Sequence, residues 1–317
     1  MDRAFMLDKL AGRTIMGRWK RRTYQLVRML GQGENGVVYL TACDGAHFAL
    51  KISWDATALS LEWERMREFS HALVAPCPKV YELDDAELDG QCAHFFVMEY
   101  VEGKNLRQYV SHQGVEAVPD LLLQLANLLH SLHERGFVYG DLKPENVLMH
   151  KATGKPILID FGGVTPLGTV VKEFTEIYDR AFWGWGMRKA DEHYDLFSLA
   201  MMGAFLYQPM NSRTREKLIQ SSPDVRKTAL SRYFQQLHER SGVGRALYFT
   251  VCGKIQRVEE FSEALKNQRQ QVAFTKSKGT VSWDVTDWGL LFSILVFTFA
   301  IISILFLGGH QSLFVIQ

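Results

Sequence analysis

The chain has 317 residues, 47% of them hydrophobic, and a formal net charge of +1 at pH 7. This length suits one domain of about 250 residues, or two small ones, and no repetitive or Pro/Gly/Ser-rich stretch divides it. Four cysteines without paired or metal-ligand spacing exclude a disulfide scaffold, and the N-terminus has no apolar run typical of a secretory signal.

Two stretches of the chain are basic and contain no acidic residue. The first lies between Asp8 and Glu34, and the second between Glu263 and Asp284. Two interpretations stay open: ordinary solvated segments, or contact with a polyanion, either anionic lipid or DNA. The basic residues are Lys9, Arg13, Arg18, Lys20, Arg21, Arg22 and Arg28 in the first stretch, and Lys266, Arg269, Lys276 and Lys278 in the second.

A glycine-rich loop separates two runs of β-forming residues, Tyr24–Leu30 and Val37–Leu40. A Rossmann fingerprint would open a helix after its last glycine, but no helical pattern follows here. The pattern therefore predicts a hairpin whose backbone N–H groups approach phosphates, with a valine over the adenine. The predicted contacts are Gly31, Gly33, Gly36 and Val38.

A third strand, Phe48–Ile52, carries a single lysine among apolar residues. Such a lysine is commonly a solvated edge residue, but the position of Lys51 after the glycine loop suits an ammonium that reaches the α- and β-phosphates. It requires a carboxylate from the following helix. At helical spacing Glu62 falls on the apolar face and Glu64 on the polar face, so we expect Glu62 to pair with Lys51.

A leucine-rich helix over Pro119–His133 precedes the residues that we expect to carry the chemistry. Phosphoryl transfer requires mainly positioning and charge neutralisation. Asp141 suits a base that accepts the proton of the substrate hydroxyl, and Lys143 suits an ammonium that reaches the transferred group. An amide and a second acid, Asn146 and Asp160, suit the metal ions.

The segment Trp288–Leu307 contains no charged residue. A helix of this length, at about 1.5 Å per residue, spans the roughly 30 Å hydrocarbon core of a bilayer. Basic residues precede it, so the region before it should face the cytoplasm of a single-pass plasma-membrane protein. We expect a juxtamembrane linker at 271–287, a membrane helix at 288–307 and a short extracytoplasmic tail at 308–317.

Taken in order, these motifs resemble the eukaryotic-type (Hanks-type) Ser/Thr protein kinases across roughly residues 24–270, with 1–23 as a basic N-terminal segment. The resemblance implies an α+β fold with a β-rich N-lobe and a helical C-lobe, joined here to one C-terminal transmembrane helix. It implies ATP and Mg²⁺ as cofactors, Ser/Thr residues of proteins as substrates, and a homodimer for autophosphorylation. It places Ala49, Met98, Glu99, Val101 and Leu148 around the adenine, with Met98 as gatekeeper.

Residues 172–190 and the Tyr139-Gly140-Asp141 variant are similar to the small membrane-anchored YabT-type kinases of spore-forming Bacillus-like bacteria, which implies a role in sporulation or stress signalling. Gly140 replaces the arginine that pairs with a phosphorylated activation loop, so we do not expect that mode of activation. An aromatic, glycine-rich stretch replaces the Ala-Pro-Glu motif. It is either a family-specific way of packing the same loop or a partner-docking surface.

Two other functions stay open at this point. One is a catalytically silent nucleotide-binding scaffold (a pseudokinase), which the full set of chemical residues argues against. The other is a small-molecule or lipid kinase, for which the lysine and proline after Asp141 are less suited than for protein substrates.

Overall fold

In the computed structural model, residues 7, 9–33, 35–70 and 77–277 are described. The chain divides into one unit of residues 1–268 and another of residues 269–317.

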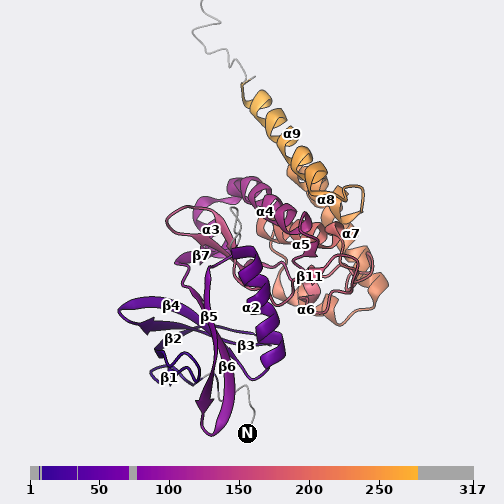
Figure 1. Cartoon of the computed structure of the whole chain (residues 1–317). Helices are drawn as coiled ribbons and strands as arrows, with labels where there is room; N and C mark the ends of the chain where they lie inside the picture. The colour runs from indigo at the N-terminus through magenta and orange to yellow at the C-terminus, as the bar shows by residue number, and fades with distance from the viewer. Residues whose placement is uncertain (1–6, 8, 34, 71–76, 278–317) are drawn as a thin grey trace, which may run out of the picture. The chain divides into compact units, whose positions relative to one another are not determined.

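The first lobe is built on an antiparallel sheet of six strands in the order β1-β2-β3-β4-β6-β5. Helix α2 (Ala56–Ser70) packs against it (Figure 1). Its buried residues recur every three or four positions, which is how one helix face covers a sheet. The strands are β1 (Thr14–Met16), β2 (Thr23–Gly33), β3 (Gly36–Cys43), β4 (Ala46–Ser53), β5 (Val80–Leu88) and β6 (Gln91–Glu99).

The second lobe is mainly helical (Figure 1). At its centre α5 is buried on all sides because its sequence is apolar all round. The helices are α3 (Leu106–Gln113), α4 (Val118–His133), α5 (Glu192–Tyr207), α6 (Ser212–Ile219), α7 (Pro223–Arg240), α8 (Gly242–Val251) and α9 (Val258–Ser277), with 3₁₀ turns η1 (Val115–Ala117), η2 (Pro144–Asn146) and η3 (Glu176–Tyr178).

Two small antiparallel sheets carry the loops of this lobe. One has the order β10-β9-β7, and the other pairs β11 with β8. Their short strands hold the ends of the segments in which the predicted catalytic residues lie. The strands are β7 (Gly103–Asn105), β8 (Phe137–Val138), β9 (Val147–His150), β10 (Pro156–Leu158) and β11 (Thr165–Pro166).

The structure places the predicted domain boundaries inside folded elements. Strand β1 pairs with β2, and Leu7, Leu10 and Ile15 are buried in the core of the sheet. The predicted start of the domain at residue 24 therefore falls within the sheet, and its predicted end at residue 270 falls within α9.

Among the described residues, no helix is both long and apolar enough to cross a membrane. The predicted membrane helix at 288–307 and the tail at 308–317 lie outside these residues.

Candidate active site

Lys51 on β4 pairs with Glu62 on α2. The lysine Nζ lies 2.6 and 2.8 Å from the two carboxylate oxygens, and both side chains are buried. The same Nζ lies 3.5 Å from Asp160 Oδ1 in the other lobe. Burial opposes the charge on Lys51, but the two carboxylates outweigh it and raise the pKa of the lysine. Lys51 is therefore a fixed cation between the two lobes.

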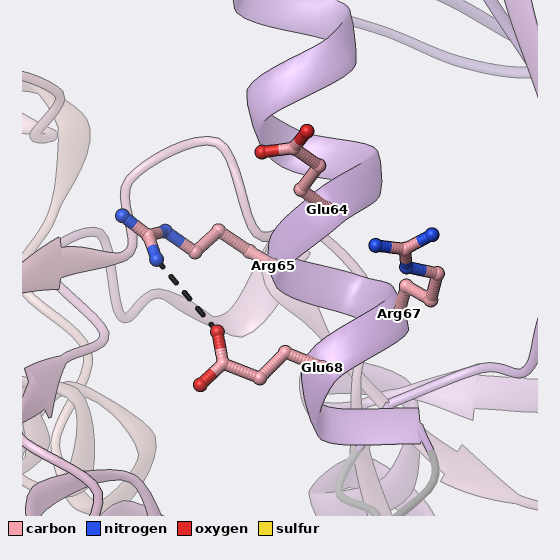
Figure 2. Close-up of a pocket in the computed structure, with 4 residues that line it drawn as sticks. All are labelled: Glu64, Arg65, Arg67 and Glu68. Carbon is pink, nitrogen blue, oxygen red and sulfur yellow. Dashed lines mark ion pairs between the residues drawn. The ribbon is translucent and has the colours of Figure 1, made fainter.

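Glu64 lies on the outer side of the same helix. It is exposed and lines a shallow cavity with Arg65, Arg67 and Glu68, in which Arg65 and Glu68 form an ion pair at 3.7 Å (Figure 2). None of the predicted site residues lines this cavity. The two glutamates thus occupy the faces that helical spacing predicted.

Asp141 and Lys143 meet in the loop between β8 and η2. Lys143 Nζ donates to Asp141 Oδ2 at 2.5 Å, and Asn146 Nδ2 donates to the Asp141 carbonyl at 2.9 Å. The side chain of Asp141 is only 15% exposed, so its charge is balanced mainly by the lysine. A base and a cation for a transferred group therefore sit side by side.

Thr175, from the segment after Asp160, completes this cluster. Its hydroxyl donates to Asp141 Oδ1 at 2.8 Å and accepts from Lys143 Nζ at 3.0 Å. Thr175 was not among the predicted site residues. The sequence offers Thr165, Thr169 and Thr175 in this segment, and no spacing rule distinguishes among them.

Gly140 gives the loop a turn that other residues resist. Its φ is +84°, and a Cβ on it would lie 2.4 Å from the carbonyl oxygen of Gly163. The N–H groups of Tyr139 and Gly140 both donate to Asp195 on α5, at 2.8 and 2.9 Å. Asp195 also accepts a hydrogen bond from His133 Nε2 at 2.8 Å, so both oxygens of its buried carboxylate have donors.

The aromatic residue that precedes Gly140 packs in the core against the Asp160-Phe-Gly turn. The rings of Tyr139 and Phe161 meet edge to face, with centroids 5.7 Å apart. Phe161 also contacts Phe69 of α2, with ring centroids 5.8 Å apart. This aromatic contact joins α2 to the catalytic loop.

The predicted adenine and phosphate contacts lie on neighbouring strands. Ala49 faces Met98 across β4 and β6, and Val38 faces Lys51 across β3 and β4. Gly36 has φ +141°, and a Cβ on it would lie 2.4 Å from the carbonyl of Ile52. Gly31 and Gly33 lie in the β2–β3 hairpin. Glu99 ends β6, and buried Val101 follows it. Half-buried Leu148 lies on β9, in a separate small sheet.

Asp160 and Asn146 are suited to hold Mg²⁺. Asn146 donates through its nitrogen, which leaves its amide oxygen for a cation, and Asp160 is 40% exposed. Carboxylate and amide oxygens are the ligands that such hard cations prefer. Burial would raise the pKa of Asp160, but Lys51 and the Gly162 N–H outweigh it and lower that pKa.

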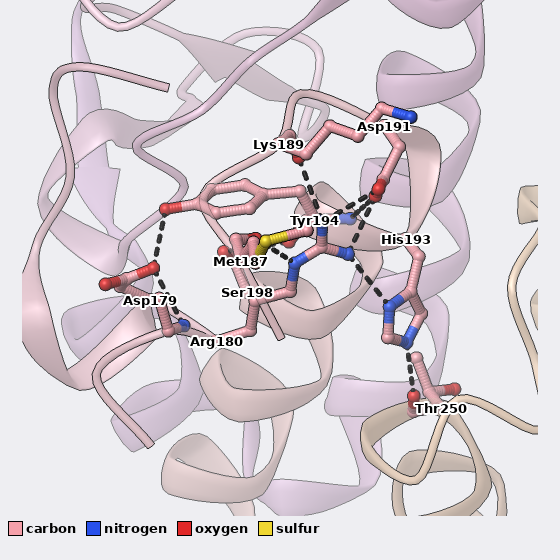
Figure 3. A network of polar contacts seen from close by, with 10 residues as sticks. Asp179, Arg180, Met187, Lys189, Asp191, His193, Tyr194, Ser198 and Thr250 are labelled. Carbon is pink, nitrogen blue, oxygen red and sulfur yellow. Dashed lines mark hydrogen bonds and ion pairs between the residues drawn. The ribbon is translucent and has the colours of Figure 1, made fainter. Parts of the chain in front are cut away.

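We call the stretch between Asp160 and α5 the activation segment. Arg180 attaches its last part to the N-terminus of α5 (Figure 3). Its guanidinium makes a bidentate pair with Asp191 at 2.7 and 2.8 Å and donates to the carbonyls of Met187 and Lys189. Ser198 of α5 donates to the carbonyl of Tyr178 at 2.8 Å. Arg180 thus holds together the two ends of the loop 180–191, in a chain that has no Ala-Pro-Glu motif.

Asp179 makes a second set of hydrogen bonds in the same part of the activation segment. It accepts from Arg188 at 2.9 Å and from the Tyr194 hydroxyl at 3.0 Å. Phe182 and Trp183, which follow it, are 7% and 1% exposed. Most of the aromatic stretch is therefore packed core, which favours family-specific packing over a docking surface.

Comparisons with known proteins agree with this geometry. The protein kinase domain model matches residues 24–236. Serine/threonine-protein kinase YabT of Bacillus subtilis is 35% identical over 268 residues, which cover 84% of this chain and 77% of that protein. Serine/threonine-protein kinase C of Synechocystis is 31% identical over 189 residues, 52% of this chain and 35% of that protein.

Two solved structures match the fold. Vaccinia related kinase 3 has a TM-score of 0.58 at 13% identity, over 85% of this chain and 95% of that one. The Cydia pomonella granulovirus kinase PK-1 has a TM-score of 0.57 at 17% identity, over 75% of this chain and 92% of that one. At these identities the likeness shows the fold alone.

The pairing of Lys51 gives a test with an internal control. We expect Glu62→Gln to lower the rate of phosphoryl transfer about tenfold or more, because a buried ammonium loses the carboxylate that positions it. Glu64→Gln, two residues away on the exposed face, should leave the rate unchanged. Steady-state kinetics with ATP checks both, and a crippled Glu64→Gln variant beside a normal Glu62→Gln variant would reverse the assignment.

Thr175 gives a second test. Thr175→Ala should lower the turnover number about tenfold to a hundredfold, since a hydrogen bond to a charged group contributes about 1.5–3 kcal/mol. ATP affinity should persist, and Thr175→Ser should restore most of the rate. Thr169→Ala is the control, because that hydroxyl bonds only the nearby Pro166 carbonyl. Equal losses in the two alanine variants would show that Thr175 has no special place beside Asp141.

Proposed function

Because this chain belongs to the protein kinase family, we propose that it transfers the γ-phosphoryl group of ATP to Ser/Thr hydroxyls of proteins in the cytoplasm, from a membrane anchor. The observation that carries the catalytic part is the cluster of Asp141, Lys143 and Thr175. The two-lobed kinase fold expected from the sequence is confirmed.

The cluster suits the proton and charge movements of this reaction. Asp141 would accept the proton of the substrate hydroxyl, and Lys143 would neutralise charge on the transferred group. Lys51, fixed by Glu62, would orient the α- and β-phosphates. Mg²⁺, held by Asp160 and Asn146, supplies charge neutralisation at the β- and γ-phosphates when bound.

The geometry argues against the two other functions. A silent scaffold would not need the Asp141–Lys143–Thr175 cluster beside an intact Lys51–Glu62 pair. For a small-molecule or lipid kinase, we see no feature in the described residues that favours such a substrate. The protein substrate therefore remains our proposal.

Two single substitutions distinguish the role of Asp141 as a base from the role of Asp160 as a ligand of the cation. Asp141→Asn should lower turnover about a hundredfold or more while ATP affinity persists, because the base touches the hydroxyl only. Asp160→Asn should lower turnover and also weaken binding of ATP in the presence of Mg²⁺. Labelled ATP with a generic protein acceptor, and calorimetry for binding, check both. Normal turnover in either variant would contradict the proposed roles.

The membrane anchor is proposed from sequence, because residues 288–307 form an uncharged stretch of spanning length. A place in sporulation or stress signalling rests on the resemblance to YabT-type kinases alone.

A turn on the first lobe supports contact with acidic lipid headgroups. Trp19 is 69% exposed and lies between Arg18 and Lys20, with Arg21 next along the chain, in a turn closed by a bond from Gly17 N to the Arg22 carbonyl. An exposed tryptophan among basic residues suits a lipid–water interface. Other basic residues of the stretch are engaged on the sheet itself: Arg13 with Asp89 and Arg22 with Glu82.

This proposal predicts salt-sensitive binding to anionic vesicles by a chain that ends at residue 285. Each basic residue near such a surface contributes about 1 kcal/mol, screened beyond about 10 Å at moderate salt. Lys20→Ala with Arg21→Ala should weaken sedimentation with the vesicles, whereas Arg13→Ala, already paired, should not. Binding that ignores salt would contradict the proposal, and tighter binding to duplex DNA than to vesicles would assign the turn to DNA instead.

A further inference from the structure

Glu173 places a fourth carboxylate at the candidate site, and the roles proposed above do not use it. It lies on the activation segment, two residues before Thr175. Its Oε2 lies 2.7 Å from the point that a Cβ on Gly162 would occupy, and Asp160 Oδ1 lies 3.4 Å from that same point. The two carboxylate oxygens are therefore neighbours, because both lie within 3.4 Å of one point.

A contact from the first lobe also reaches Glu173. The side chain of Asn35, in the glycine-rich hairpin, lies near this carboxylate and favours its charged form. Glu173 is half-buried, and burial, together with the charge of Asp160, raises its pKa. The carboxylate thus sits where three segments meet: the hairpin over the phosphates, the Asp160-Phe-Gly turn and the activation segment.

The charges around this point do not balance. Four carboxylates, those of Glu62, Asp141, Asp160 and Glu173, share two ammonium groups, those of Lys51 and Lys143. Lys51 pairs most closely with Glu62, and Lys143 with Asp141. Asp160 and Glu173 are therefore the carboxylates of this group that pair least closely with an ammonium group.

We propose that Glu173 supplies an oxygen ligand to the divalent cation that binds with ATP, together with Asp160 and Asn146. Hard cations such as Mg²⁺ bind carboxylate oxygens, and among the described residues no lysine or arginine forms an ion pair with Glu173. The proposal rests on the proposed function, because it assumes that the cleft binds ATP with a cation.

The contact would have a consequence for regulation. Gly140 lacks the side chain through which a phosphorylated loop is usually clamped. A cation held by both Asp160 and Glu173 would add a further attachment between the activation segment and the Asp160-Phe-Gly turn. Nucleotide binding, rather than phosphorylation, would then stabilise the part of the segment that precedes Tyr178.

Calorimetric titration of the full chain with ATP, once with Mg²⁺ and once with EDTA, tests the ligand role. Glu173→Gln should weaken binding in Mg²⁺ about tenfold or more. The same variant should bind ATP more tightly in EDTA, because a negative charge near the phosphates is gone. Glu176→Gln is the matched control, since it removes the same charge from an exposed position three residues on.

The changes in ATP affinity expected in Mg²⁺ and in EDTA have opposite signs, which distinguishes a ligand role of Glu173 from simple repulsion of ATP. Tighter binding in both buffers would show that Glu173 only repels ATP, and no change in either would show that it does not reach the site. Either result would overturn the proposal. Failure of the unsubstituted chain to bind ATP at all would instead overturn the proposed function on which it rests.

Two further measurements keep the test sharp. Glu173→Asp retains the charge but withdraws the oxygens, so it should lose affinity in Mg²⁺ without gaining any in EDTA; this variant decides the matter if Glu173→Gln fails to fold. Hydrogen exchange should show that ATP with Mg²⁺ increases the protection of residues 167–177 in the unsubstituted chain and in Glu176→Gln, but not in Glu173→Gln. Equal protection in all three would overturn the ordering role.

Discussion

The active site depends on one buried carboxylate. Asp195 is wholly inaccessible to solvent, and a charge in such a place is tolerated only when its oxygens are saturated with donors. The N–H groups of Tyr139 and Gly140 and the ring of His133 supply those donors. The carboxylate thereby fixes the backbone immediately before Asp141, at a left-handed turn that only glycine adopts without strain.

The same helix also holds the activation segment. Ser198 of α5 binds the Tyr178 carbonyl, Tyr194 binds Asp179, and Asp191 at the N-terminus of α5 binds Arg180. Because α5 is buried on all sides, both segments are attached to the core of their lobe. Asp141 and Thr175, which are far apart in the sequence, meet because each is anchored there.

The sequence predicted site residues either from the spacing of a regular element or from a short motif such as Asp160-Phe-Gly. Helical spacing distinguished Glu62 from Glu64, and the structure pairs Lys51 with Glu62. Thr175, Glu173 and the Arg180–Asp191 pair lie in an irregular segment, where no period relates a residue to its neighbours in space. The sequence marked residues 1–23 only as a basic segment, because a strand of three residues such as β1 is too short to give a clear alternating pattern.

The central claim is that two anchored loops and the Lys51–Glu62 pair form one site for ATP and a divalent cation. A crystal structure of the full chain with Mg²⁺ and a non-hydrolysable ATP analogue tests it most directly. The account predicts the α- and β-phosphates at Lys51, the cation at Asp160 and Asn146, and the γ-phosphate within reach of Lys143. An analogue bound elsewhere, or phosphates directed away from Lys51 and Asp160, would contradict it.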